Sequence, residues 1–184
     1  MANTPSNMLP LGSVAIDFKL FDTVSQQILS LQDIKGDRGT VVFFICNHCP
    51  FVIHVNEELV RIANDYQSQG ISFIAISSND VVNYPQDGPD LMRENAKEFQ
   101  YPFPYLYDET QEVAKAYDAA CTPDNYLFDE GLELVYRGQI DNSRPGNGKA
   151  VTGEDLRNAL DRLIDKKANL ENQKPSMGCN IKWK

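Results

Sequence analysis

The chain has 184 residues, of which 42% are hydrophobic, and this length and content suffice for one globular domain with a sizeable core. Its 26 acidic and 17 basic residues give a formal net charge of −9. This charge argues against nucleic acid or a membrane as a partner, because both reward a basic surface. No basic start leads into an apolar run, and no stretch approaches the roughly 20 apolar residues of a membrane helix. The sequence therefore predicts a soluble cytoplasmic protein.

Apolar residues alternate between short strand-like runs and helical stretches. The patterns predict strands over 15–21, 27–31, 40–45, 71–77, 125–129 and 132–140. They predict helices over 50–69, 89–99, 110–117 and 152–167, the last with Thr152 as its N-cap. We expect a single domain over residues 1–167. The final residues, 168–184, show no periodicity and are predicted to be a tail that carries Cys179.

The runs at 40–45 and 71–77 are almost continuously apolar, as expected of strands that are buried on both faces. The helix predicted between them implies parallel strands joined by a right-handed crossover. Only Glu130 and Gly131 separate the last two predicted strands, which favours an antiparallel hairpin. The chain therefore reads as an α/β fold with a mixed sheet.

Four cysteines, Cys46, Cys49, Cys121 and Cys179, are too few and too unevenly spaced for a secreted disulfide scaffold. Cys46 and Cys49 stand two residues apart where a buried strand is predicted to run into a helix. Disulfide exchange needs a thiolate and a second thiol nearby, and the N–H groups of a helix start lower the pKa of the first thiol. His48 can stabilise the Cys46 thiolate further. The pattern favours a redox-active dithiol.

Two other interpretations of the cysteine pair remain open. A structural zinc site usually brings a second close pair of ligands, whereas Cys121 and Cys179 stand singly and far apart. Inert core cysteines are the other possibility, since free cysteine is commonly buried. The spacing of the cysteines predicts no metal site, and we expect no cofactor beyond the redox-active disulfide itself.

Three segments carry a family resemblance: LGSVAIDFKLFDT (11–23), TVVFFICNHC (40–49) and CTPDNYLFDEGLELVYRG (121–138). They resemble the thioredoxin-like redoxins, the group that contains the AhpC/TSA-type thiol–disulfide oxidoreductases, and the resemblance extends over roughly residues 11–167. The string CNHCP and the ending PSMGCNIKWK resemble a bacterial subgroup. The resemblance implies a thioredoxin fold, with a central mixed sheet flanked by helices and an N-terminal strand extension.

The resemblance also implies roles for individual residues. Cys46 would be the attacking thiolate and Cys49 the resolving thiol. Pro123 would be a cis-proline that faces the dithiol, and Thr122 would offer backbone groups to an extended substrate. His48 stands where more oxidising relatives also carry histidine, so we expect a reduction potential less negative than that of thioredoxin. The implied partners are a protein or small-molecule thiol or disulfide and a thiol reductant.

Departures from the resemblance define the alternatives. The buried acid of thioredoxins, six residues before the first cysteine, is replaced by Thr40, so the route of the proton is open. The peroxidase pattern Pro-x-x-x-Thr-x-x-Cys is absent, because Gly39 and Phe43 occupy its positions relative to Cys46. A peroxiredoxin-like antioxidant enzyme is nevertheless the first alternative function, and a metal-binding or redox-sensing module is the second.

Several residues outside the motif are further candidates. The carboxyl ends of parallel strands share one edge of a sheet, which should bring Ser78–Asp80 and the loop 141–151 close to the dithiol. Arg144 in that loop is a candidate for binding an acidic substrate, or it is merely solvated. Cys121 and Cys179 are candidate accessory redox residues, or packed thiols. A tail of this length can reach the site within one chain or across a homodimer.

Overall fold

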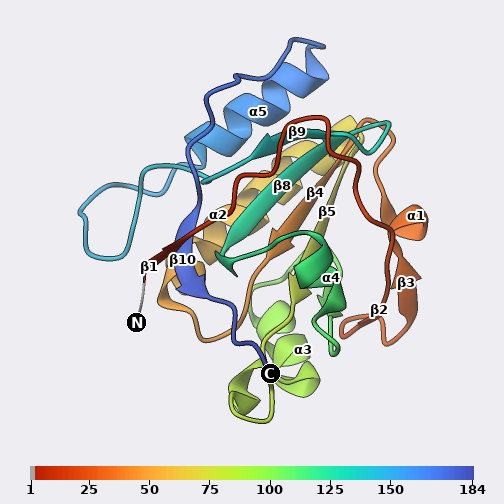
Figure 1. Ribbon diagram of the computed structural model, residues 1–184, viewed down its shortest axis with the longest axis vertical. Helices are drawn as coiled ribbons and strands as arrows, with labels where there is room; N and C mark the ends of the chain where they lie inside the picture. The colour runs from red at the N-terminus through yellow and green to blue at the C-terminus, as the bar shows by residue number, and fades with distance from the viewer. Residues whose placement is uncertain (1–2) are drawn as a thin grey trace.

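The computed structural model describes residues 3–184 and shows how they alternate between strands and helices (Figure 1). The strands are β1 (Asn3–Pro5), β2 (Lys19–Asp22), β3 (Ile28–Ser30), β4 (Gly39–Phe44), β5 (Ile71–Ser77), β6 (Tyr105–Tyr107), β7 (Cys121–Thr122), β8 (Asp124–Asp129), β9 (Leu134–Arg137) and β10 (Met177–Asn180). The helices are α1 (Leu31–Ile34), α2 (Pro50–Tyr66), α3 (Pro89–Glu98), α4 (Glu112–Ala116) and α5 (Glu154–Ile164), with the short 3-10 helices η1 (Gln67–Gln69) and η2 (Pro85–Asp87). Of these, α1, η2, β1, β6, β7 and β10 are not predicted from the sequence.

A seven-stranded mixed sheet in the order β3-β2-β6-β5-β4-β8-β9 forms the centre of the molecule. Strand β4 pairs in parallel with β5 and in antiparallel with β8, so the predicted crossover and the predicted hairpin are both present. Every residue of β4 is buried. Because β4 is central and leads directly into the cysteine motif, the position of the motif is set by the most buried strand of the fold.

The side chains of β4 alternate between two apolar layers, as the pleat of a strand requires. Val41 and Phe43 belong to the core that is shared with α2, α3 and α5, whereas Val42 and Phe44 belong to the core that is shared with α1 and α4. The sheet is therefore covered on both faces, with α2 and α4 on opposite sides of it (Figure 1). This covering explains why β4 and β5 are apolar throughout rather than alternating.

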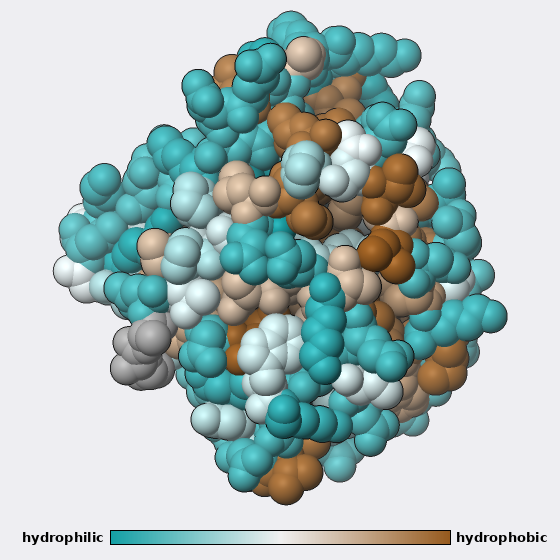
Figure 2. Space-filling view, viewed as in Figure 1, coloured by the Kyte–Doolittle hydropathy of each residue, from teal (hydrophilic) through white to brown (hydrophobic). Residues whose placement is uncertain are grey.

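Hydrophobic side chains are also exposed where the N-terminal segment crosses the sheet towards β2 (Figure 2). They include Leu11, Val14 and Ile16, of which Val14 is 66% exposed. None of the helices in residues 3–184 has the length and apolar character needed to cross a bilayer.

The start of α5 differs from the prediction. The N-cap is Gly153, in the left-handed region with φ = 65°, and not Thr152. The carboxylate of Asp141 accepts hydrogen bonds from the backbone N–H groups of both residues, at 2.7 and 2.8 Å. A side chain from the preceding loop therefore serves the helix start, and a glycine is needed because a Cβ there would meet the side chain of Ile62.

The C-terminal segment is not the unstructured tail that the sequence predicts. Residues Met177–Asn180 form β10, the middle strand of a second, three-stranded sheet in the order β1-β10-β7. Beyond β10, the N–H of Ile181 donates to the carbonyl of Ala120, and the N–H of Lys182 donates to the side chain of Asn79. Short strands whose partners lie more than 50 residues away leave no periodic signal, and therefore β10 escapes a sequence-based assignment.

Candidate active site

Cys46 and Cys49 lie at the carboxyl end of β4, where the chain turns into α2. Both are thiols and both are buried, at 2% and 0% exposure. The sulfur of Cys46 is 3.5 Å from the hydroxyl of Thr122, and the sulfur of Cys49 is 3.1 Å from the carbonyl oxygen of the same residue. The Thr122–Pro123 peptide bond is cis, as the family resemblance implies. The cysteine motif and the Thr122–Pro123 segment are far apart in the sequence, but they lie against each other in the structure.

The start of α2 favours the second cysteine rather than the first. Cys49 is the N-cap and Pro50 occupies the first turn, where its missing N–H costs nothing. The backbone N–H of Val52 lowers the pKa of Cys49. The sequence predicts the start of the helix correctly at Pro50 but assigns the helix N–H groups to the sulfur of Cys46. In the structure the N-cap is Cys49, so the unpaired N–H groups follow the second cysteine.

The two thiols shift each other's pKa in opposite directions. The interaction with Cys46, followed by contributions from Thr122, Cys179 and Val52, lowers the pKa of Cys49 to about 4 although burial opposes it. The same interaction raises the pKa of Cys46, with burial and the charge of Asp87 acting in the same direction. The contact between Cys49 and the Thr122 carbonyl works against a Cys49 thiolate, because it is a hydrogen bond only while the thiol keeps its proton. Proton loss is therefore a property of the pair and not of either thiol alone.

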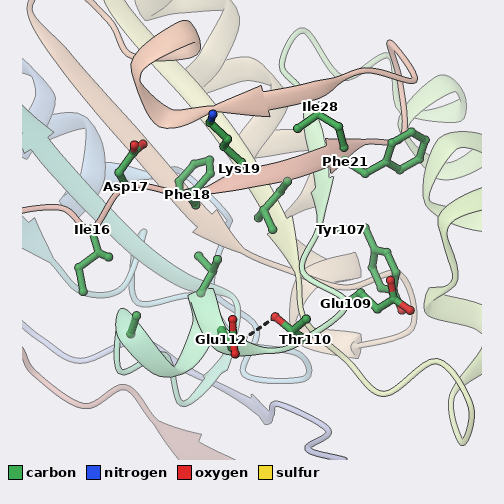
Figure 3. A pocket seen from close by; sticks show the side chains of 13 residues that line it. Ile16, Asp17, Phe18, Lys19, Phe21, Ile28, Tyr107, Glu109, Thr110 and Glu112 are labelled. Atoms are coloured by element: carbon green, nitrogen blue, oxygen red, sulfur yellow. Dashed lines mark hydrogen bonds between the residues drawn. The ribbon is translucent and has the colours of Figure 1, made fainter.

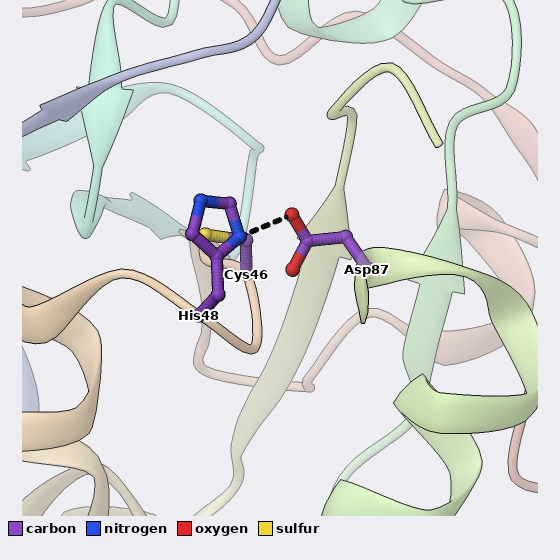
Figure 4. A group of neighbouring side chains, drawn as sticks. All are labelled: Cys46, His48 and Asp87. Atoms are coloured by element: carbon purple, nitrogen blue, oxygen red, sulfur yellow. Dashed lines mark hydrogen bonds and ion pairs between the residues drawn. The ribbon is translucent and has the colours of Figure 1, made fainter. Parts of the chain in front are cut away.

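A buried acid that the sequence analysis missed lies beside the dithiol. Asp87, in η2, is fully buried and accepts a hydrogen bond from the ring of His48, between Nδ1 and Oδ2, at 2.7 Å (Figure 4). It also accepts hydrogen bonds from the backbone N–H of Asn47 and the side chain of Asn79. The ring of His48 stacks on Tyr84 at 5.6 Å between centroids. Sequence reasoning placed Ser78–Asp80 at this edge but had no signal for an acid 39 residues after His48.

The side chains of Cys46, His48 and Asp87 lie within 4.8 Å of one another, so they are the group of described residues that fits a metal ion best. Three protein donors already occupy the two carboxylate oxygens of Asp87. A cation would have to displace these donors, and a structural zinc site is normally completed by four ligands. The hydrogen-bond network therefore explains the arrangement better than a metal centre does.

The network suggests a test of His48. We expect His48→Ala to slow alkylation of the dithiol by iodoacetamide at pH 7 by about tenfold, because the imidazole no longer stabilises a thiolate at Cys46. We also expect the reduction potential of the dithiol to become more negative by about 30 mV, since about 1.4 kcal/mol of stabilisation of the reduced form is lost. Redox titration followed by mass spectrometry measures the shift.

The other histidine of the chain, His54 in α2, provides a control. It is part-buried, and its ring hydrogen-bonds to the hydroxyl of Ser143 at 2.7 Å and not to Asp87. His54→Ala should leave both the alkylation rate and the potential at the wild-type values. Equal shifts in the two variants would show that His48 acts only through the helix and not through the thiolate.

Two further predicted site residues, Cys121 and Thr122, form strand β7. Thr122 contacts both thiols, but β7 is also paired with β10, with Thr122 opposite Cys179 and Cys121 opposite Asn180. The predicted pairing of Thr122 with an extended substrate stays a prediction, and β10 occupies that position in the structure. The thiol of Cys121 donates to the carbonyl of Pro123 at 3.5 Å, and burial together with the charge of Asp124 raises its pKa.

Arg144 lies near the site but is engaged within its own loop. Its guanidinium donates to the carbonyl oxygens of Asp141 and Ser143, and to the side chain of Gln139. It lines a small hollow together with Pro123. The predicted role of Arg144 in binding an acidic substrate therefore stays a prediction. The residue lies beside Pro123, but its guanidinium is already hydrogen-bonded to other residues of this chain.

A cavity of about 550 Å³ opens between β2 and α4, bordered by Asp17, Lys19, Phe21, Tyr107 and Glu112 among others (Figure 3). It shares no lining residue with the dithiol, Thr122 or Asp87. Two thiols, an imidazole and a buried carboxylate lie together at the cysteine motif. We therefore place the candidate active site there and not in this cavity.

Comparison with known proteins shows the family of the chain. Residues 11–137 match the model of the AhpC/TSA family. The chain is 59% identical to an uncharacterized conserved protein from Geobacillus kaustophilus, with a TM-score of 0.98 over 100% of this chain and 97% of the other. It is 25% identical over 125 residues to the thiol-disulfide oxidoreductase ResA of Halalkalibacterium halodurans, a match that covers 67% of this chain and spans 65% of that relative.

A more distant structure shows the fold. The thioredoxin domain of a thiol-disulfide oxidoreductase from Bacteroides vulgatus is 21% identical, with a TM-score of 0.65 over 85% of this chain and 99% of the domain. Together with the mixed sheet, the flanking helices and the cis-proline beside a Cys-x-x-Cys pair, these matches agree with the resemblance. The chain belongs to the AhpC/TSA family and has the thioredoxin fold.

Proposed function

We propose that this protein is a thiol–disulfide oxidoreductase that works through the Cys46–Cys49 dithiol. The observation that carries the proposal is the shared contact with Thr122: the sulfur of each cysteine lies within 3.5 Å of that residue, directly before the cis peptide bond. Two thiols that meet at one residue supply both the nucleophile and the resolving group that disulfide exchange requires.

Cys46 is the attacking residue in this proposal. Cys49 is enclosed by the thiols of Cys46 and Cys179, whereas Cys46 lies beside His48, whose side chain is 24% exposed. The proton of Cys46 passes to Cys49, and the Cys46 thiolate attacks one sulfur of the substrate disulfide. The other substrate sulfur leaves as a thiolate and takes up the proton of Cys49. The Cys49 thiolate then attacks Cys46, the bond between Cys46 and the substrate breaks, and the reduced substrate leaves while the Cys46–Cys49 disulfide forms.

A peroxidase is less well supported. Phe43 stands where the peroxidase pattern has its threonine, and its ring is buried among Phe73 and Phe103 rather than directed at the dithiol. The nearby Arg144 gives its guanidinium to carbonyl oxygens of its own loop. These observations supply no peroxide-positioning group at Cys46.

Trapping tests the proposed roles. Cys49→Ser removes the resolving thiol, so we expect mixed disulfides between Cys46 and substrate proteins to accumulate in cell extract and to disappear after reduction by dithiothreitol. The matched control is the double variant Cys46→Ser/Cys49→Ser, which should capture none of them. Capture of the same proteins by the double variant would show that the pair does not perform the exchange. Capture by Cys46→Ser alone would make Cys49 the attacking residue.

A further inference from the structure

We propose that Cys179 is a third redox-active cysteine, which attacks Cys49 in the Cys46–Cys49 disulfide and moves the disulfide to Cys49–Cys179. The proposal rests on the proposed oxidoreductase function and adds a step within the same chain. It also separates Cys179 from Cys121, which the sequence alone leaves as equivalent candidates.

Strand pairing directs Cys179 to the dithiol. In an antiparallel pair, residues directly opposite each other carry their side chains on the same face. Cys179 is opposite Thr122, whose hydroxyl lies against Cys46 and whose carbonyl oxygen accepts from Cys49. Cys179 and Cys49 belong to the same buried cluster, and each thiol shifts the pKa of the other. The sulfur of Cys49 thus has a thiol neighbour on each of two elements, Cys46 on the loop before α2 and Cys179 on β10.

The same alternation excludes Cys121. Successive residues of a strand point to opposite faces, so the side chain of Cys121 points away from the face that Thr122 presents to the dithiol. Its thiol donates to the carbonyl of Pro123 instead.

The surrounding contacts hold Cys179 in place. A Cβ on Gly178 would meet the backbone carbonyl of Thr122, so glycine at this position lets β10 approach β7 closely. After the strand, Lys182 is fixed on both sides, because its N–H donates to Asn79 and its carbonyl accepts from Asp80 and Gln111. Cys179 is 3% exposed and Cys49 is fully buried. The two sulfurs are therefore kept together by the fold and do not depend on a chance encounter of a tail.

Strand β10 also lies where an extended substrate is expected to pair with Thr122. The N–H of Ile181 donates to Ala120, and hydrogen-bonded pairs recur at every second position of an antiparallel ladder. Thr122 and Cys179 are accordingly such a pair. The chain presents its own strand, with a cysteine, at the position where the family resemblance puts the substrate.

The step is balanced without an added oxidant. The Cys179 sulfur forms a bond to the Cys49 sulfur, the Cys46–Cys49 bond breaks, and Cys46 leaves as a thiolate beside His48. The proton of Cys179 passes to Cys46, so one thiol and one disulfide are present before and after. In the dithiol form, burial and the interaction with Cys49 raise the pKa of Cys179 to about 12, whereas Lys182 lowers it. Once Cys49 is in a disulfide it carries no charge, and its contribution to this rise is lost.

The Cys46→Ser variant tests the step. After oxidation with diamide, acid quenching and alkylation under denaturing conditions, peptide mapping should find Cys49 joined to Cys179 in most molecules, with Cys121 alkylated. Cys46→Ser/Cys179→Ser should form no internal disulfide. Wild type treated in the same way should contain both Cys46–Cys49 and Cys49–Cys179, and Cys179→Ser only the first. Cys46→Ala replaces Cys46→Ser if the serine variant does not fold, as judged by circular dichroism.

Two outcomes separate the proposals. If Cys46→Ser keeps Cys49 and Cys179 as thiols, or joins Cys49 to Cys121, under conditions that give Cys46–Cys49 in wild type, then the relay is wrong and the oxidoreductase function stands. If wild type itself forms no Cys46–Cys49 disulfide, then the proposed function fails first.

Discussion

Replacing Cys46 by serine should abolish turnover in the reduction of a protein disulfide, such as those of insulin, by dithiothreitol. A serine hydroxyl is not ionised near neutral pH and forms no disulfide, so neither the attack nor the resolving step is available. The measurement is the rate of disulfide reduction by the variant relative to wild type, with the uncatalysed rate as the baseline.

Cys121→Ser is the control for this experiment. The serine hydroxyl can donate to the carbonyl of Pro123 as the thiol does, and position 121 faces away from the dithiol. We expect this variant to keep most of the wild-type turnover. If Cys46→Ser retained turnover and Cys121→Ser lost it, then the catalytic thiol would have to be reassigned.

Replacing Arg137 by methionine should lower the free energy of unfolding at pH 8 by about 3–5 kcal/mol. Arg137 and Asp124 form a fully buried ion pair at 3.2 Å, and Arg137 also donates to the carbonyl of Asp118. Its guanidinium lies over the ring of Tyr126, 4.4 Å from the centroid. The variant leaves the Asp124 carboxylate buried without its cation. Urea denaturation followed by circular dichroism measures the loss.

The loss should depend on pH in a defined direction. Burial raises the pKa of Asp124 to about 6, although Arg137 opposes this rise. The pKa of this carboxyl group is higher in the folded state than in the unfolded state, where it is near 3.8. The group therefore contributes stability that is fully present below pH 3.8 and is lost as the pH rises through about 6. Without Arg137 the pKa of Asp124 should rise further, so the carboxyl of the variant is neutral at pH 5. The destabilisation should therefore be smaller at pH 5 than at pH 8.

Two controls complete this prediction. Arg61 pairs with Glu58 at 2.7 Å but is 55% exposed, so Arg61→Met should cost less than about 1 kcal/mol. The double variant Asp124→Leu/Arg137→Met should recover part of the loss, because it leaves no unpaired buried charge. Equal losses for Arg61→Met and Arg137→Met would contradict the role assigned to the buried pair.

The buried pair also bears on the active site. Asp124 directly follows Pro123, and its carboxylate accepts from the N–H of Ala120, just before Cys121. Arg137 therefore ties the segment that contains the cis peptide bond to β9. The sequence does not predict this pair, because an arginine in a strand is normally solvated and nothing local marks Arg137 as buried.

Local patterns determined much of this protein from the sequence alone. The continuous apolar runs of β4 and β5, the helical spacing of α2 and the Glu130–Gly131 turn predict the central strand–helix–strand unit and the hairpin, because each depends on neighbours within a few residues. The candidate site could be predicted because short motifs carry the family resemblance. These motifs contain Cys46, Cys49, Thr122 and Pro123.

Only the tertiary structure decided what surrounds the two thiols. The partners Asp87 and Cys179 come from η2 and β10, which are joined to the motif by long-range hydrogen bonds and strand pairing that no local pattern records. The sequence predicts the start of α2 at Pro50, but only the structure shows that Cys49 and not Cys46 is its N-cap. The pairing of β7 with β10 places Cys179 opposite Thr122 and Cys121 opposite Asn180. This register, which the sequence does not show, is why we assign the accessory redox role to Cys179 and not to Cys121.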